Sequence, residues 1–276
     1  MGGSFSSTFE IVNFYLNQNK QLTYNNKRIY GWKRQLPDQR DHYIVFNSNN
    51  NKLNCIDLRD NCPDIYNQGN LGSCTANGIA FAYQYVQIKQ KIPNFVPSRL
   101  FIYYNERYME GTVNYDSGAN IRDGIKSINK QGICDEKEWV YDISKFTDKP
   151  TNQCYIDAKK NLSVKYKQIP QNIEQFKLAL TEGFPIVFGF SVYESFESEI
   201  VSKTGIVPIP KLDEKLLGGH CVCIVGFIED KSQFIVRNSW GKNWGDKGYC
   251  YFPYEYLENY DLSNDFWIIE QVEDKE

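Results

Sequence analysis

The spacing of apolar residues changes part-way along this chain, and the predicted secondary structure changes with it. Between about residues 74 and 132, apolar residues recur every three or four positions, which indicates helices that bury one face. After about residue 160, short runs rich in β-branched and aromatic residues are bounded by turn residues, which is typical of strands. Helices followed by an antiparallel sheet predict an α+β fold.

The first predicted helix begins near Cys74, with Ser73 as its cap, and ends at about residue 91, before Pro93. The apolar residues that share one of its faces are Ala76, Ile79, Ala80, Tyr83 and Val86. The sequence therefore places Cys74 at a helix N-terminus, where the positive end of the helix dipole favours a thiolate.

Further helices are expected from residue 97 to about 109, and from near residue 119 to 129, the latter ending at Gly132. The expected strands cover residues 186–190, 221–227, 233–237 and 248–252. Residues 1 to about 52 are polar and loop-rich, with one short apolar stretch at 9–16. We interpret them as an N-terminal extension.

Composition and charge narrow the function classes. A chain of 276 residues with 41% hydrophobic content suits one or two modest domains with a core. The net charge of −3 argues against a nucleic-acid surface. Residues 1–46 carry six basic and three acidic groups (+3), so the rest carries −6 (−3 − 3).

Membrane and targeting signals are few. The sequence has no apolar run long enough for a transmembrane helix and no charged start leading into an apolar core, so neither a transmembrane segment nor a secretory signal is expected. Gly2 and Ser6 match the N-myristoylation pattern, which short Gly/Ser-rich starts also match by chance. The match at Gly2 therefore indicates either a membrane contact through a myristoyl group or a chance match. The sequence leaves the cellular compartment of the protein open.

The candidate chemistry centres on Cys74 and His220. Only two histidines occur, and His42 lies in the polar N-terminal stretch, so His220 is the expected base for a Cys74 nucleophile. A thiol becomes a nucleophile when a nearby base takes its proton. The alternatives are a buried structural cysteine and a satisfied core histidine, and the residues around both positions argue against them.

Those surrounding residues resemble three motifs of the papain-like cysteine peptidases. The segment from Gln68 to Cys74 resembles the nucleophile motif, residues 218–227 the histidine strand, and residues 237–241 the asparagine motif. The Cys-to-His separation is 146 residues (220 − 74) and the Cys-to-Asn separation 164 (238 − 74), against ~130–150 in the family. The resemblance covers about residues 53–270.

The resemblance implies a papain-like two-lobe fold, with a helical left lobe, an antiparallel β-barrel-like right lobe and the active-site cleft between them. The expected organisation is an extension at 1–52, prosegment-like or inhibitory, and a peptidase domain at 53–276. Within that domain the helical lobe covers about 61–160 and the β lobe about 161–270. Residues 30–32, 36–38, 97–104 and 265–267 are similar to a divergent, short-prosegment branch found in bacteria, protists and giant DNA viruses.

The resemblance also implies roles for single residues. Cys74 is the nucleophile, His220 the general base and acid, and Asn238 fixes the His220 tautomer. Gln68 supplies an oxyanion donor together with the Cys74 N–H. The expected substrate-binding residues are Gly118 and Ala119, which would pair with a peptide backbone, and Gly219 and Trp240 beside the catalytic pair. The alternatives are a surface glutamine for Gln68, an ordinary turn for Gly118 and a plain core aromatic residue for Trp240.

The chain departs from the family pattern at two positions. Leu71 stands where papain has a disulfide-forming cysteine, and Thr75 replaces the aromatic residue that usually follows the nucleophile. Seven cysteines remain besides Cys74, at positions 55, 62, 134, 154, 221, 223 and 250, and no pair has zinc-type C-x2-C spacing. We therefore expect buried free thiols, with Cys221 and Cys223 alternating on a buried strand, and neither a metal site nor a cofactor.

The sequence thus predicts a monomeric endopeptidase that acts on polypeptides through a Cys74 thioester. Two alternatives are another acyl transfer on the same scaffold, such as removal or ligation of a ubiquitin-like tail, and a non-catalytic binding or structural protein. Because papain-like peptidases are usually held inactive by a segment across the cleft, the basic extension is expected to restrain the enzyme. A structural brace or a membrane anchor is the other reading of this extension.

Overall fold

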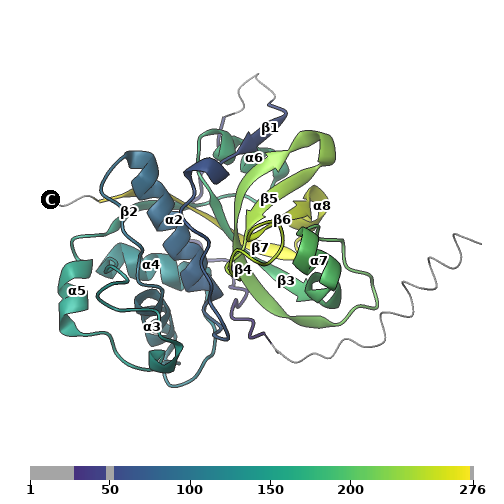
Figure 1. The fold of residues 1–276 in the computed structure, drawn as a ribbon. Coiled ribbons are helices and arrows are strands. Elements are labelled where there is room, and N and C mark those ends of the chain that lie inside the picture. Colours follow the sequence, from purple (N-terminus) through teal and green to yellow (C-terminus); the bar gives the residue numbers. More distant parts are fainter. Residues whose placement is uncertain (1–27, 48–52, 274–276) are drawn as a thin grey trace, which may run out of the picture.

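The computed structural model describes residues 28–47 and 53–273. The helices within residues 74–158 gather on one side, and most of the strands lie on the other side together with three short helices (Figure 1). The extension's apolar stretch at 9–16 and Gly2 lie outside the described residues. Within residues 28–47, the secondary structure consists of isolated bridges at Trp32 and Tyr43.

The three predicted helices are present within about two residues of their expected bounds. They are α2 (Cys74–Gln90), α3 (Arg99–Glu110) and α4 (Ile121–Gln131), and the shorter α5 (Asn152–Ala158) follows. Every residue of α2 from Cys74 to Gln87 is buried, because the helix packs against α3 and α4 on one side and the sheet on the other. Ser73 occupies the predicted N-cap position, but its side chain makes no capping hydrogen bond, so this part of the prediction is wrong.

The sheet runs in the order β2-β7-β3-β4-β5-β6, and each of these neighbouring pairs is antiparallel. The predicted strands are β3 (Ile186–Tyr193), β4 (Leu216–Ile228), β5 (Gln233–Arg237) and β6 (Tyr249–Pro253). The sequence did not predict β1 (Cys55–Asp57), which pairs with β4, nor β2 (Ser163–Gln168) and β7 (Ser263–Val272). It also missed α6 (Ile173–Thr181), α7 (Glu199–Thr204) and α8 (Tyr254–Glu258). Short 3-10 turns lie at Arg59–Asn61, Ile143–Lys145, Glu194–Glu197 and Glu229–Lys231.

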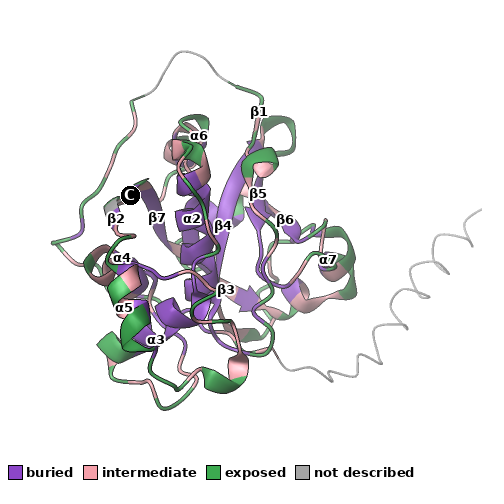
Figure 2. Cartoon of the chain, turned by 60° about the vertical axis from the view of Figure 1, so that its left-hand side comes forward, coloured by how far each residue is buried: buried purple, intermediate pink, exposed green. Residues whose placement is uncertain are grey.

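Strand β4 separates the two halves of the core. Cys221 and Cys223 face α2, and the Cys223 thiol donates to the Gly78 carbonyl at 3.4 Å, whereas Val222 and Ile224 belong to the apolar cluster on the other side. This confirms the predicted alternation on a buried strand. Figure 2 shows α2 and β4 as adjacent buried elements. Residues on β4 therefore lie at the junction of the lobes.

Among the residues that the structure describes, the helices are too short or too polar to cross a membrane.

Candidate active site

Cys74 is the first residue of α2 and is fully buried. Burial raises the pKa of its thiol to about 12, and the backbone N–H groups of Cys221 and Gly31 act against this shift. The sulfur therefore lies beside β4, next to the peptide unit that follows His220, and also beside Gly31 of the extension.

His220 is fully buried on β4, and its Nε2 is 2.8 Å from the Asn238 side-chain oxygen. Asn238 comes directly after β5, the strand paired with β4. Burial lowers the pKa of His220 to about 4, although the Asn238 hydrogen bond raises it. The other ring nitrogen, Nδ1, makes no hydrogen bond within the described part of the chain, so it is the atom left to exchange a proton.

The His220 ring lies between aromatic side chains. Trp240 stacks on it with ring centroids 4.8 Å apart, and Phe190 contacts it edge-on at 5.7 Å. These rings keep water from the His220–Asn238 hydrogen bond, which strengthens the bond and fixes the orientation of the imidazole.

Gln68 is buried in the turn before α2 and is held from several sides. Its side-chain amide donates to the Leu71 carbonyl at 2.9 Å, and its side-chain oxygen accepts from the Ser239 hydroxyl at 2.6 Å. Its backbone N–H donates to the Ser239 carbonyl, and the Tyr141 hydroxyl donates to its carbonyl. The turn is therefore tied both to the asparagine segment and to the loop that carries Tyr141.

Asp116 joins the nucleophile turn to the glycine segment. Its carboxylate accepts from the Gly72 N–H at 2.9 Å and from the Tyr103 hydroxyl, which in turn accepts from the Gly118 N–H at 3.1 Å. This hydrogen-bonded link fixes the spacing between Cys74 and Gly118.

Thr75 does not contribute to the cleft surface. It is fully buried, and its hydroxyl donates at 2.8 Å to the carboxylate of Glu106, a fully buried residue of α3. Burial raises the pKa of Glu106. The departure from the family pattern at position 75 thus lies inside the helical lobe.

Residues 28–35, which we call the cleft segment, run across the site. The Ala119 N–H donates to the Gly31 carbonyl at 2.7 Å, and the Lys33 N–H donates to the Ala119 carbonyl at 3.1 Å, so Trp32 and Ala119 form a parallel bridge. On the other wall, the Trp32 N–H donates to the Gly219 carbonyl at 2.9 Å. The segment is therefore held as an added strand between the lobes.

Gly31 makes the closest approach to the nucleophile turn. A Cβ at this position would lie 1.7 Å from the Gly72 carbonyl oxygen, so only glycine fits. Its N–H points at the Cys74 sulfur, while its carbonyl is bound by Ala119. The sulfur therefore faces an amide N–H rather than a carbonyl carbon that it could attack.

The Trp32 side chain is buried in a pocket that Gly189 and Gly219 leave open. Its indole N–H donates to the Asp265 carboxylate at 3.1 Å, and the Gln35 N–H donates to the same oxygen at 3.3 Å. Asp265 is 3% exposed, and burial raises its pKa to about 7 despite these hydrogen bonds. The Asp265 carboxylate therefore accepts two hydrogen bonds from N–H groups of the cleft segment.

The two ends of the described extension are also anchored. The Arg28 guanidinium lies 3.7 Å from the centroid of the Trp240 ring and 3.4 Å from the Glu197 carboxylate. Beyond the cleft, Asp41 forms a buried ion pair with Arg122 at 2.6 Å, and Ile44 bonds through its backbone to β2. Both ends therefore hold the segment in place.

Comparison with known proteins identifies the family. The family model for "Papain family cysteine protease" matches residues 54–267. The chain belongs to the papain family of cysteine proteases. An uncharacterized peptidase C1-like protein of Acanthamoeba polyphaga mimivirus is 48% identical over 274 residues, covering 90% of this chain and 88% of the relative.

A solved structure is also close to this papain-family protease. Xylellain, a cysteine protease from Xylella fastidiosa, is 41% identical, with a TM-score of 0.82 and coverage of 90% of this chain and 98% of xylellain. Cysteine proteinase 1 of Entamoeba histolytica is 29% identical over 195 residues, 67% of this chain and 58% of the relative. These matches confirm the divergent papain-like fold, and this protease is a hydrolase whose substrates are polypeptides.

All eight predicted site residues lie in one region of the structure. The role of each residue is still a prediction. Cys74 is the first residue of α2 and Gln68 lies in the preceding turn, while His220 lies on β4 and Asn238 directly follows β5. Gly118, Ala119 and Gly219 line the cleft segment, and Trp240 covers His220.

The sequence interpretation assigned no role to Ser239, Tyr141, Asp116 or Asp265, although Ser239 and Asp265 lie within the quoted segments 237–241 and 265–267. Each acts through a contact between segments distant in the chain, such as Ser239 with Gln68, 171 residues apart. The available signal for the cleft segment was Gly31 between Tyr30 and Trp32, an arrangement that suits close backbone approach with aromatic anchors on both sides.

Proposed function

We propose that this protease is an endopeptidase that cleaves peptide bonds through a Cys74 thioester. His220 Nδ1 takes the thiol proton, the thiolate attacks the scissile carbonyl, and His220 returns the proton to the leaving amine. A water molecule, deprotonated by His220, then hydrolyses the thioester. The main support is that Cys74 at the start of α2 and His220 on the adjoining strand β4 are both buried, with Asn238 bound to Nε2 of the His220 ring.

Two donors near the sulfur suit an oxyanion. The backbone N–H of Cys74 begins α2, and the side-chain amide of Gln68 lies in the preceding turn, donating to Leu71. When substrate binds, this amide would donate to the carbonyl oxygen of the substrate instead, as negative charge develops on that oxygen. One such donor stabilises the transition state by ~3–4 kcal/mol.

Extended polypeptides fit the cleft better than an isolated amide. Ala119 and Gly219 already bind a three-residue stretch of backbone, from Gly31 to Lys33, through three hydrogen bonds. A substrate that makes the same bonds spans the site in both directions, as endopeptidase action requires. Another acyl transfer would use the same groups, and profiling with peptide libraries and ubiquitin-like substrates separates the two.

We further propose that the cleft segment inhibits the enzyme. It occupies Ala119 and Gly219, fills the Trp32 pocket and presents an N–H to the sulfur. Burial raises the pKa of Cys74 and lowers the pKa of His220 while the segment is in place, so both are neutral in this state. Removal of the segment would hydrate both groups and favour the thiolate–imidazolium pair.

Gly31→Ala is expected to raise kcat/KM of the full chain ~10–100-fold on a short fluorogenic peptide, because the methyl group overlaps the Gly72 carbonyl and overpacking costs ~1–3 kcal/mol. A shortened chain beginning near Asn51 should be at least as active. Leu36→Ala is the matched control, since Leu36 directly follows the cleft segment, is 84% exposed, and its loss should change little. A folded Gly31→Ala variant and a folded shortened chain that are both no more active than the full chain would refute inhibition.

Inhibition should weaken as pH rises through about 7. In the closed state the pKa of Asp265 is about 7, mainly because it is buried. After opening it should approach its usual ~3.9, so the closed state holds the extra proton and is favoured at low pH. Formation of the Cys74–His220 ion pair moves one proton internally and adds little to this balance.

The measurement is the ratio of kcat/KM between the full chain and Gly31→Ala from pH 5.5 to 8.5. The ratio should rise toward one with increasing pH, and Asp265→Asn should flatten the curve. Arg122 and Arg34 also lower the pKa of Asp265. A ratio that falls with pH would show that another group controls closure.

A further inference from the structure

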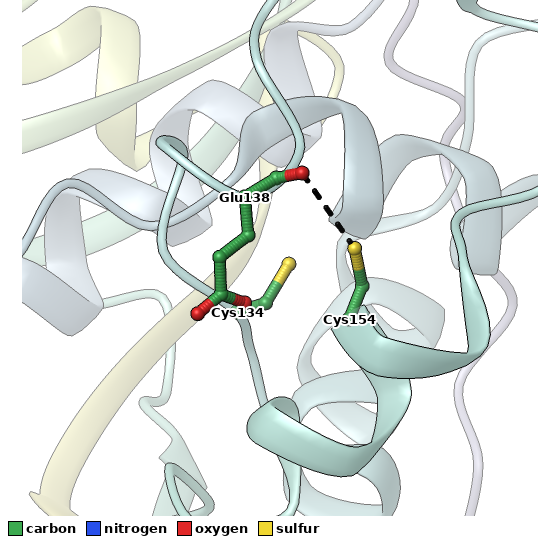
Figure 3. A group of neighbouring side chains, drawn as sticks. All are labelled: Cys134, Glu138 and Cys154. Atoms are coloured by element: carbon green, nitrogen blue, oxygen red, sulfur yellow. Dashed lines mark hydrogen bonds between the residues drawn. The ribbon is translucent and has the colours of Figure 1, made fainter.

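Three side chains with metal-binding atoms meet in the helical lobe, away from the active site. Cys134 follows α4, Glu138 lies in the next turn and Cys154 belongs to α5 (Figure 3). The two sulfur atoms and a carboxylate oxygen all lie within 4.8 Å of one another. Both cysteines are buried and Glu138 is exposed.

We propose that this cluster binds a thiophilic divalent cation of the zinc class, with the Cys134 and Cys154 thiolates and the Glu138 carboxylate as its ligands. Zn–S bonds of ~2.3 Å and Zn–O bonds of ~2.0–2.2 Å allow such ligand atoms to share one tetrahedral ion after small side-chain rotations. Water takes the fourth position on the exposed side, where Glu138 also provides a path of entry.

The surroundings favour a cation. The Cys134 and Cys154 sulfur atoms are buried beside the Glu138 carboxylate. Nearby, Asp135 pairs with Lys137 and Asp157 pairs with Lys160, so the Glu138 carboxylate leaves one acidic group in excess. A divalent ion would release the two thiol protons to solvent and compensate the charge of the thiolates.

Neighbouring polar groups orient the ligands. The Thr151 hydroxyl lies 3.1 Å from the Cys154 sulfur, and that sulfur also contacts the Glu138 carbonyl at 3.8 Å. The Ser98 N–H donates to the Cys134 carbonyl at 2.9 Å. Supporting contacts of this kind set ligand geometry in metal sites.

The site would close the base of the loop between Gly132 and Cys154. This loop carries Tyr141, which contacts the Ser73 hydroxyl and the Gln68 carbonyl in the nucleophile turn. It also carries Glu136, which forms an ion pair with Arg99 at 2.6 Å. A bound ion would therefore stabilise one support of the active site without touching the reacting atoms.

The test uses the full chain with Cys74→Ala, which removes the catalytic thiol as a competing ligand. We expect one equivalent of Zn²⁺ to bind after reduction, Co²⁺ to give thiolate charge-transfer absorption, and Zn²⁺ to raise the Tm. Cys134→Ser and Cys154→Ser should abolish all three, Glu138→Gln should weaken binding ~10-fold, and Cys55→Ser, at an exposed cysteine, should change nothing.

Binding that persists in both cysteine variants would overturn the proposal. A disulfide between Cys134 and Cys154 would also overturn the proposal. Peptide mapping without reductant would detect it, and it would have to re-form in air and leave no reduced chain able to bind Zn²⁺. If either serine variant fails to fold, the test is alkylation of the cysteines in the Cys74→Ala chain, with and without Zn²⁺. Zn²⁺ should protect the Cys134 and Cys154 peptides selectively, and equal labelling with and without Zn²⁺ would contradict the site.

Discussion

Replacing Cys74 by alanine abolishes peptide hydrolysis and leaves the fold intact. Alanine suits the first position of α2, and the loss of one buried sulfur creates only a small cavity. The reaction then lacks its nucleophile, because His220 and the oxyanion donors stabilise an attack that no longer occurs. The assay belongs in the Gly31→Ala background, where the cleft is open, with the Tm measured alongside.

Cys250→Ala is the matched control for this prediction. Cys250 is equally buried, but it lies on β6 and its thiol contacts the Val236 carbonyl. The control should lose some stability and keep its turnover. Residual turnover above background in the Cys74→Ala variant, with the control active, would exclude Cys74 as the nucleophile.

The second large effect concerns Gln68. Gln68→Ala should lower kcat ~10²–10³-fold with little change in KM, since its amide acts on the developing oxyanion rather than on bound substrate. The residue also holds the turn through Ser239, so a purely structural loss must be distinguished. Ser239→Ala removes that hydrogen bond but keeps the donor, and its kcat should fall far less.

A change confined to KM in the Gln68 variant would assign the side chain to ground-state binding. Equal losses of kcat in Gln68→Ala and Ser239→Ala, with equal losses of Tm, would assign it to supporting the turn.

Local patterns in the sequence were enough to predict the helices and strands that carry the catalytic pair. α2 and β4 combine strong periodicity with flanking turn residues, and the three motifs around Cys74, His220 and Asn238 are each contiguous. Both lobes of the fold could be predicted for this reason, because their elements follow one another along the chain.

Contacts between distant segments could not be predicted in this way. β7 was missed because Asp265, with a φ of 61°, interrupts the strand pattern, and its carboxylate meets Trp32, 233 residues away. The proximity of Cys134, Glu138 and Cys154 could not be predicted for a related reason, since Cys134 and Cys154 come from separate segments that lack zinc-type spacing. The charge argument for the extension rested partly on residues 1–27, which lie outside the described residues.

The most direct test of a Cys74 nucleophile covered by the cleft segment is the rate at which an epoxide inhibitor labels the full chain. Intact mass and peptide mapping give the number and position of adducts over time, for the full chain, Gly31→Ala and Leu36→Ala. The account predicts a single adduct at Cys74, formed slowly in the full chain and in Leu36→Ala, and at least ~10-fold faster in Gly31→Ala. Labelling at another cysteine, or equal rates in the full chain and a folded Gly31→Ala variant, would contradict it.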